Sequence, residues 1–546
     1  MNKNWLKQNF LFVFFILFVA VYATLLLIDP RLGPTDDYMF LRTLQNGKLF
    51  LPYSQNFPYF DTAKLGRFSP LAAMEYNLFG LFFKSPSPFL YYFYHAVQFT
   101  IFAVLIVKLL SKFTTNKFLF YGVPALFFLT PGVVISWFRM QMNERNVIFF
   151  LAAFFLCYLA YFDKRKIIYF ISTIFFANLV IYSKETTFIA IGVFVFFHLV
   201  FSWKIFDKRV KILDGLLMLS SFLYVAIYYF YVYLHRGPNV YGGINFNLLT
   251  FIKNFLNYGF FSDPMLILIL LPLTIWRISK VFFQRQEAHP VYDSMLLTAS
   301  TYIAAVFVLN MYGPYYLLPA YILALPPLIY FFSQRQPKII FWKIFGGITA
   351  LFFIVNVLPS GLHYLTYYKY LPVNFNKTLD LLIQDINSKY PSQRANIFLD
   401  GVDRGTGRGT YFVLAEFLRF KDLSDKQFDL KSNVKTEKAL PLISEIPIPF
   451  TVFETNAPDE IKNGDYLIVS PQSTRINPTK TYLESLKKDY ELVFQTRSRF
   501  AFPNFNLKTL VKYLLAKKLS PEQKSAGAMV NENLMNWPDY YVFVRR

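Results

Sequence analysis

The chain has 546 residues, of which 55% are hydrophobic, 20% aromatic and only 16% charged. Because a soluble chain of this length needs more charged surface, the composition excludes ordinary globular, disordered and collagen-like proteins. Its single cysteine, Cys157, excludes a disulfide framework and a cysteine-built zinc site, and its five histidines show no i,i+4 pair typical of a metal site. The composition therefore predicts a polytopic membrane protein.

The net charge of +22 is unevenly divided along the chain. Residues 361–546 hold 26 basic and 20 acidic residues, whereas residues 1–360 hold 29 basic and 13 acidic residues. The excess positive charge therefore lies in the apolar part. Bases that flank apolar segments are typical of cytoplasmic loops, so the charge predicts membrane loops and no nucleic-acid partner.

Apolar runs of about 20 residues indicate about eleven membrane spans. They lie near 9–28, 89–109, 118–137, 146–162, 167–182, 187–203, 213–234, 264–277, 294–312, 315–332 and 339–358. The first run follows Lys3 and Lys7 as a secretory signal would. It continues to Ile28, too long for a cleaved signal, so we expect an uncleaved first helix.

The loops between these spans differ in charge, which predicts their orientation. With a cytoplasmic N-terminus, every inner loop is short and basic; together these loops carry Lys108, Lys112, Lys117, Lys164, Arg165, Lys166, Lys204, Lys208, Arg209, Lys211, Arg277, Lys280, Arg285, Arg335 and Lys338. The outer segments are acidic or mixed and include one long loop, roughly 29–88. We therefore expect a multi-pass protein of the inner (plasma) membrane, with its C-terminal part outside the cytoplasm.

The chain changes character after residue 358, where polar residues return and no run is long enough to span a membrane. Short β-type runs lie at 396–400, 465–470, 491–495 and 540–544, and helix-like runs lie near 375–389, 410–420, 480–488 and 507–518. The sequence predicts a transmembrane module over 1–358. It predicts a small extracytoplasmic α/β domain over 359–546, packed on the outer face of the membrane.

Ionisable residues at the edge of an apolar bundle are costly, so each is a functional hypothesis. Asp36 and Asp37 follow the first helix. Two adjacent carboxylates raise one another's pKa toward a range useful for a proton acceptor, or share a cation. The alternative is a solvated acidic pair in a loop.

Three further charged groups are predicted on the same outer face. Arg139, Glu144 and Arg145 could bind a phosphate through guanidinium groups, with Glu144 orienting them, or they could mark helix ends. Lys184 could hold a phosphate as a point charge, or it could be an interfacial lysine paired with Glu185. Arg67 lies in the long outer loop.

The order of these elements resembles the GT-C superfamily of membrane glycosyltransferases. It is most similar to family 39, which includes protein O-mannosyltransferases and the lipid A aminoarabinose transferases. The likeness is carried by Thr35-Asp36-Asp37-Tyr38, Phe68 to Phe83, Thr130-Pro131 to Phe150 with Glu144, Ser183-Lys184-Glu185, and Pro314 to Tyr321. The chain departs from the family in having Phe68-Ser69-Pro70 for His-Pro-Pro, Glu144 for Asp, and Tyr315 for Arg.

The resemblance implies a polyprenyl-phosphate-linked sugar donor, an acceptor that is a protein, lipid or glycan, and inversion at the sugar. It implies Asp36 as general base with Asp37 beside it, and donor-phosphate binding by Arg139, Arg145 and Lys184. Supporting positions would be Arg67, Glu144, Glu185 and Tyr316. A divalent Mg²⁺ or Mn²⁺ ion, if used, would bind Asp36, Asp37 and Glu144.

Two other functions compete with a transferase. A transporter or flippase for a lipid-linked envelope precursor usually places charges near the midplane and shows paired halves, whereas these charges gather at one interface. An envelope scaffold with a decayed site would tolerate alanine at the charged positions.

Overall fold

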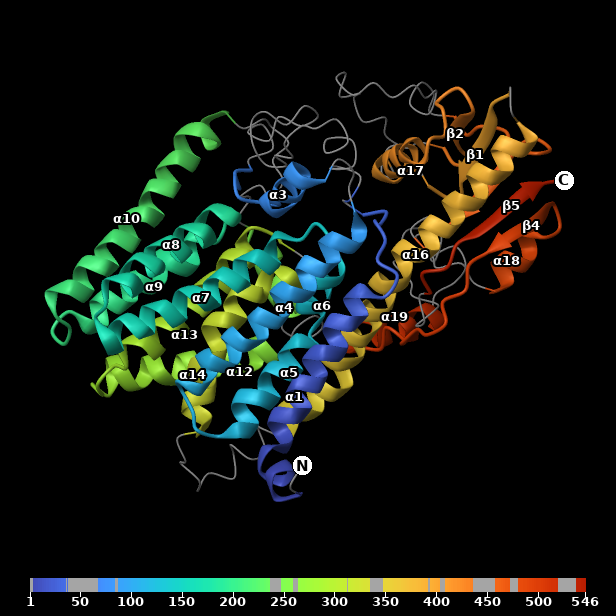
Figure 1. Ribbon diagram of the computed structural model, residues 1–546. Coiled ribbons are helices and arrows are strands. Elements are labelled where there is room, and N and C mark those ends of the chain that lie inside the picture. Colours follow the sequence, from blue (N-terminus) through green and yellow to red (C-terminus); the bar gives the residue numbers. More distant parts are fainter. Residues whose placement is uncertain are drawn as a thin grey trace.

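The computed structural model describes residues 3–35, 37, 67–83, 87–235, 247–258, 264–311, 313–333, 347–390, 393–402, 408–435, 457–471, 480–518 and 537–546. A bundle of apolar helices occupies one half of the molecule and a small sheet domain the other (Figure 1). We call the end of the bundle nearest the sheet its sheet end. Predicted residue Asp36 lies outside the described residues.

The first half of the bundle runs from the N-terminus to the broken span. Its helices are α1 (Lys3–Leu27), α3 (Met74–Phe82), α4 (Pro88–Ser111), the π-helical turn η1 (Phe118–Gly122), α5 (Val123–Phe128) and α6 (Pro131–Phe138). The sequence predicts one span over 118–137, but the α5 and α6 axes differ by 62°. The break falls at Leu129 and Thr130, directly before Pro131, because proline cannot donate the hydrogen bond that would continue the helix.

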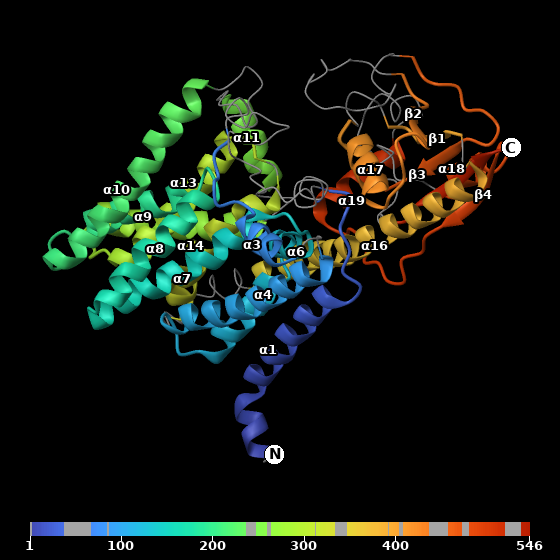
Figure 2. The same cartoon turned by 45° about the horizontal axis from the view of Figure 1, so that its top comes forward.

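The remaining bundle helices follow in chain order. They are α7 (Asn143–Lys164), α8 (Ile167–Ser183), α9 (Phe188–Ser202), α10 (Lys208–Tyr231), η2 (Tyr233–His235), α11 (Leu248–Leu256), α12 (Pro264–Ile278), η4 (Ser279–Phe283), α13 (Pro290–Val308), η5 (Pro314–Leu317) and α14 (Leu318–Ser333). Figure 2 shows α1 at the edge of this bundle, with α7, α8, α9, α10 and α13 grouped at the far side.

Among the described residues, seven helices are long and apolar enough to cross a membrane, or eight if the bent α5–α6 pair is one span. A polytopic helical membrane protein is therefore confirmed. Three of the eleven predicted spans coincide with shorter helices: α8 has 17 residues, and α9 and α12 have 15 each. At 1.5 Å per residue they fall below the roughly 30 Å of a hydrocarbon core, so their crossing stays a prediction.

The bundle core is built from aromatic side chains, as the Phe-rich composition requires. Trp137, fully buried, stacks on Phe102 with ring centroids 5.2 Å apart and meets Phe99 edge to face at 5.5 Å. Offset and edge-to-face contacts of this kind add about 0.5–1.5 kcal/mol each beyond burial. They join the middle of α4 to the C-terminal end of α6.

One helix links the bundle to the sheet domain. The π-turn η6 (Phe353–Val357) leads without interruption into α16 (Leu358–Lys389), which runs from the membrane part into the sheet domain (Figure 1). The predicted domain boundary at residues 358 and 359 therefore falls inside one continuous helix, Gly347–Lys389. The division into two modules stays a prediction, with α16 belonging to both.

The sheet domain is small and mixed, as predicted. It contains β1 (Ala395–Leu399), α17 (Arg408–Phe420), β2 (Phe428–Ser432), β3 (Tyr466–Val469), α18 (Lys480–Leu486), β4 (Tyr490–Gln495), α19 (Leu507–Lys518) and β5 (Tyr541–Arg545). The strand order is β2-β1-β3-β5-β4; β1 pairs parallel with β2 and β3, whereas β5 pairs antiparallel with β3 and β4. Four strands were predicted and β2 was not.

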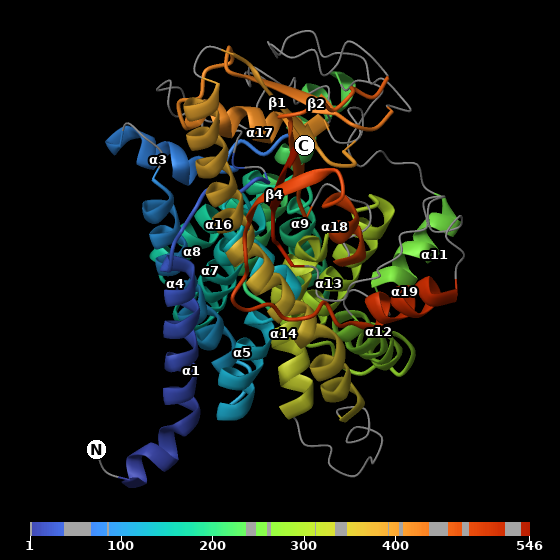
Figure 3. The ribbon, with the colours of Figure 1, turned by 90° about the vertical axis from the view of Figure 1, so that its right-hand side faces the viewer.

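Alternating side chains give each face of the sheet its own helices. Ile397 and Leu399 pack with α16 and α17 on one face, whereas Phe398 packs with α18 on the other. This alternation follows from the two-residue period of a strand. The C-terminal part of α16 thus packs in the core of the sheet domain. This packing holds the domain beside the bundle (Figure 3).

Candidate functional site

The chain that follows α1 is held along α16 at the sheet end. Lys369 on α16 donates to the Ile28 carbonyl oxygen, and Asn376, two turns further along the same face, donates to the Leu32 carbonyl oxygen at 2.9 Å. These contacts satisfy backbone carbonyls of the segment that follows α1. They position the predicted acidic segment against α16.

Asp37 is buried at this place, with 2% of its surface exposed. Its Oδ2 atom accepts a hydrogen bond from the Gly33 backbone N–H at 2.6 Å. Gly33 also permits a close approach to α16, because a Cβ there would lie 3.3 Å from Pro372 Cγ. Asp37 is therefore not a solvated loop acid.

A second acidic group lies at the N-terminus of α7. Glu144, 4% exposed, accepts from the Lys184 ammonium group at the end of α8. The Lys184 Nζ atom also lies 4.2 Å from the ring centroid of Tyr316 and 6.0 Å from that of Tyr315. Three segments far apart in the sequence thus bring together one lysine, one carboxylate and two aromatic rings.

Next to Lys184, a partly buried ion pair joins the predicted outer loop to the turn between α8 and α9. Arg67 Nε donates to Glu185 Oε1 at 2.8 Å. Burial raises the pKa of the Glu185 carboxyl, but the charges of Arg67 and Lys184 lower it more, so the carboxyl stays ionised. The predicted alternative, in which Lys184 pairs with Glu185, does not occur, because Lys184 pairs with Glu144 and Glu185 with Arg67.

Two backbone hydrogen bonds hold Arg67 at this position. The Leu71 N–H donates to the Tyr182 carbonyl oxygen at 3.2 Å, and the Tyr224 hydroxyl donates to the Phe68 carbonyl oxygen at 2.8 Å. The loop is therefore fastened to the ends of α8 and α10. This attachment places Arg67 beside Glu185 without a regular element of its own.

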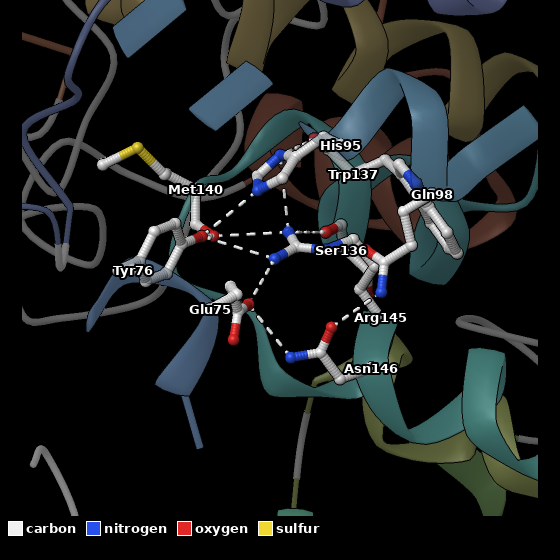
Figure 4. Close-up of polar contacts among 9 residues, drawn as sticks. All are labelled: Glu75, Tyr76, His95, Gln98, Ser136, Trp137, Met140, Arg145 and Asn146. Atoms are coloured by element: carbon white, nitrogen blue, oxygen red, sulfur yellow. Dashed lines mark hydrogen bonds and ion pairs between the residues drawn. The ribbon is translucent and has the colours of Figure 1, made fainter. Parts of the chain in front are cut away.

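The neighbouring residue on α7, Arg145, is fully buried in a polar network (Figure 4). Its Nη2 atom donates to Glu75 Oε1 at 2.9 Å and to the Tyr76 hydroxyl at 3.3 Å. Its Nε atom donates to Gln98 Oε1 at 2.8 Å. Its Nη1 atom contacts the carbonyl oxygens of Ser136 and Met140, each at 3.3 Å, and His95 Nδ1 at 3.4 Å. Every guanidinium nitrogen of Arg145 therefore has a protein partner.

The partners of Arg145 are bonded to one another as well. Asn146 donates to Glu75 Oε1 at 3.0 Å and accepts from Gln98 at 2.8 Å. The Tyr76 hydroxyl donates to the Met140 carbonyl oxygen and lies 3.2 Å from His95 Nε2. The network ties α3 to α4, α6 and α7, and buried polar groups connected in this way fix a single arrangement of their elements.

The two predicted arginines differ in their surroundings. Arg139 caps the C-terminus of α6, with its guanidinium carbon 5.7 Å from the Tyr368 ring centroid on α16. Arg139 therefore lies against α16, whereas Arg145 lies in the network on α7.

Sequence reasoning missed the partners of Arg145. Glu75 was recognised only as an outer-loop acid, and Tyr76, His95, Gln98 and Asn146 were not singled out. A signal was present for three of these partners. His95 and Gln98 stand one helical turn apart within the second apolar span, and Asn146 opens the fourth, where a polar side chain is costly unless bonded.

Two further buried polar clusters lie at the other end of the bundle. Asp214 on α10 accepts from the Tyr158 hydroxyl at 2.6 Å and contacts His198 Nδ1 at 2.7 Å, and all three residues are fully buried. Arg277 and Asp293 form a bidentate pair with bonds of 2.7 and 2.6 Å. Both clusters lie between helices rather than between loops.

The possible metal ligands do not form a group in the described part of the chain. There, no three His, Cys, Asp or Glu residues lie close enough together to hold a metal ion. Asp37 and Glu144 have the backbone and lysine partners given above, and Asp36 lies outside the described residues. The predicted Mg²⁺ or Mn²⁺ site is therefore not tested.

No protein-family model matches the sequence, and no curated protein matches it. Among solved structures, the chain is similar to the archaeal oligosaccharyltransferase AglB from Archaeoglobus fulgidus in complex with an inhibitory peptide and a dolichol-phosphate. The two are 12% identical, the match covers 99% of this chain and 89% of that chain, and the TM-score is 0.40. This is a distant similarity of architecture, so the roles of individual residues rest on their contacts.

Proposed function

We propose that the chain is a membrane glycosyltransferase that uses a sugar linked to a polyprenyl phosphate. The observation that supports it is the convergence of buried charged groups at the sheet end of the bundle. Asp37, the Glu144–Lys184 pair and the Arg67–Glu185 pair come from segments far apart in the sequence. In this proposal the sheet end faces away from the cytoplasm and the site is of the family 39 type.

The proposed reaction is a single displacement with inversion. The acceptor hydroxyl oxygen forms a bond to the anomeric carbon of the sugar while its proton passes to the Asp36 or Asp37 carboxylate. The bond between the anomeric carbon and the phosphate oxygen breaks, and its electrons leave with the lipid phosphate. Such a base must lie within hydrogen-bond reach of the hydroxyl, directly or through one water.

Lys184 is the proposed cation for the departing phosphate. An ammonium group carries three N–H donors, and Glu144 is the one acceptor that the described residues supply. The rings of Tyr315 and Tyr316 limit the space around it, so its charge is screened little by water. A preorganised cation of this kind stabilises charge that develops in the transition state.

In this proposal Arg145 does not bind the donor phosphate, which is the role predicted for it from the sequence. A phosphate would have to displace hydrogen bonds to Glu75, Tyr76 and Gln98 in order to reach its guanidinium group. We therefore propose it as a positioning residue that holds the start of α7, and with it Glu144. Arg139 keeps its proposed place as a phosphate ligand, at the C-terminus of α6.

The first test is the glycan profile of the cell envelope. Cells that carry Asp36→Asn/Asp37→Asn are compared by mass spectrometry with wild-type cells at equal membrane levels of the protein. Loss of one defined sugar increment, with accumulation of a lipid-phosphate sugar, is expected. Asp29→Asn is the matched control, because Asp29 lies in the same segment but is exposed and forms a surface ion pair with Arg31. An unchanged profile would overturn the base assignment and favour the transporter and scaffold alternatives.

A second test removes the lysine without leaving a buried charge unpaired. Glu144→Gln/Lys184→Met should fold, since both charges of the pair are removed together. We expect its transfer rate with purified donor to fall by about 10²–10³-fold, the usual effect of losing one preorganised donor. The single variant Glu144→Gln retains the lysine and should lose less. Equal activity of the double variant and the wild type would remove Lys184 from the site.

A further inference from the structure

The part of α16 that lies in the bundle carries a row of polar side chains. Asn356, Ser360, His363 and Thr366 are spaced three or four residues apart, so they share one face, and all four are buried. They belong to the candidate span Gly347–Lys389. Polar residues within a span are costly, so their bonding partners define what covers this face.

The partners come from the sheet domain, 136 to 151 residues later in the chain. The Phe502 N–H donates to Thr366 Oγ1 at 3.4 Å, and His363 Nδ1 lies 2.8 Å from the Phe502 carbonyl oxygen. Asn506 Nδ2 donates to Ser360 Oγ at 2.7 Å.

The lowest contact on α16 is made by the start of α19. The Leu507 N–H donates to Asn356 Oδ1 at 2.8 Å. Above the row, Asn374 Nδ2 donates to Ser498 Oγ at 3.1 Å. The segment 498–507 therefore runs antiparallel to α16, from its sheet-domain part down into its membrane part.

The depth of this segment follows from the position of Lys369. That residue bonds the Ile28 carbonyl oxygen, directly after the candidate span Asn9–Leu27, and so marks the membrane boundary at the sheet end. Asn356 stands 13 residues earlier, which at 1.5 Å per residue is about 20 Å along the helix axis. A hydrocarbon core is about 30 Å thick and α16 is tilted (Figure 1), so Leu507 lies inside the core and not at its surface.

Non-helical backbone is tolerated at that depth only where protein satisfies its polar groups. The row on α16 does so for the N–H and C=O of Phe502 and for the N–H of Leu507. On the side away from α16, the segment exposes apolar rings: Phe500 is 70% exposed, Phe502 43% and Phe505 37%. In the following helix α19, Leu514 is 53% exposed. Water would be a poor surrounding for these side chains.

We propose that residues 498–507 form a re-entrant arm that inserts from the sheet domain into the hydrocarbon core of the membrane. Its occupant is the acyl-chain region of phospholipids, which receives Phe500, Phe502 and Phe505. The arm gives the sheet domain a second attachment besides α16. Figure 3 shows α19 beside the bundle helices and apart from the strands. This inference does not depend on the proposed transferase activity.

The test uses the full-length protein in phosphatidylcholine nanodiscs. In a Cys157→Ala background, Phe500→Cys is labelled with an environment-sensitive fluorophore. Val493→Cys is the matched control, because Val493 is 37% exposed on β4 of the same domain. We expect a blue-shifted emission and strong quenching by spin-labelled lipid at position 500, and quenching by aqueous iodide at position 493. Iodide quenching of both positions, without lipid quenching, would overturn the proposal.

A second measurement needs no substitution. The unmodified protein is reconstituted with a photoactivatable phosphatidylcholine that carries its reactive group on the acyl chain, and cross-linked peptides are mapped by mass spectrometry. Cross-links within 498–507 are expected, as they are on the exposed face of α10. Cross-links on α10 without any in this segment would place the arm outside the lipid.

Discussion

Arg145 and Lys184 are both buried cations at the sheet end, but they differ in how many protein groups bind them. Arg145 is bonded by groups on α3, α4 and α6 and by the Met140 carbonyl oxygen, whereas the described acceptor of Lys184 is Glu144 alone. A cation that is fully bonded holds elements together, and one that retains donors can bind a ligand. Under the proposed function, a buried positive charge would thus serve two purposes, a structural one at Arg145 on α7 and a ligand-binding one at Lys184 after α8.

The network around Arg145 predicts a large effect on stability. Arg145→Met would leave the Glu75 carboxylate buried without its cation, which typically lowers the free energy of unfolding by about 3–5 kcal/mol. We expect a clearly lower Tm in detergent for this variant. Arg31→Met is the control, because Arg31 forms an exposed pair with Asp29, and such pairs contribute about 0–1 kcal/mol. Equal Tm values for the two variants would contradict the assigned role.

At the scale of elements, α16 packs against the break between α5 and α6. Gly361 on α16 lies against the backbone of Leu129 and Thr130, where the bent span turns. The absence of a side chain at Gly361 lets two backbones approach, as small residues do at helix contacts within membranes. This contact keeps α6, and with it Arg139 at its C-terminal end, beside α16.

The close approach at Gly361 can be tested with a single methyl group. In Gly361→Ala the new Cβ would overlap the Leu129 carbonyl oxygen, so α16 and α6 would have to separate. We expect a loss of about 3 kcal/mol or more, at the upper end of overpacking effects, seen as a lower Tm. Gly215→Ala on α10 is the control, since a Cβ there has no heavy atom within 4 Å. An unchanged Tm for Gly361→Ala would contradict the contact.

At the scale of the whole molecule, the charged sites and the sheet domain share one end of the bundle, and the basic loops lie at the other. Lys164, Arg165 and Lys166 connect α7 to α8 at the end away from the sheet. Positive loops of this kind are retained in the cytoplasm. The sheet domain and the proposed site would therefore face outward.

This orientation can be measured by cysteine labelling in a Cys157→Ala background. Val493→Cys lies on the sheet domain and Lys166→Cys in the basic loop, and both positions are exposed. A membrane-impermeant maleimide should label position 493 in intact cells and position 166 only after permeabilisation. Labelling of both positions in intact cells, or the reverse pattern, would contradict the predicted topology.

Four of the five strands and the membrane class could be predicted from the sequence, because apolar runs and β-type runs are local properties. The strand β2 was missed since Phe428-Asp-Leu-Lys-Ser contains only two apolar residues. It is a strand because β1 supplies its hydrogen bonds along a parallel register. The grouping of charged residues at one end of the bundle could also be predicted from the sequence. Successive spans run in opposite directions, so every second loop lies on the same side.

By itself the sequence determined that the chain enters a membrane repeatedly and ends in a small sheet domain, because burial of so many Phe and Tyr side chains leaves no other class. Only the tertiary structure decided which charges meet. Arg145 finds Glu75 across 70 residues and Lys184 finds Glu144 across 40, and neither separation follows from a helix or strand period. The sequence likewise placed segment 498–507 in the soluble domain, because its polar partners on α16 are distant in the chain and leave no local pattern. Only the packing of the chain reveals these partners.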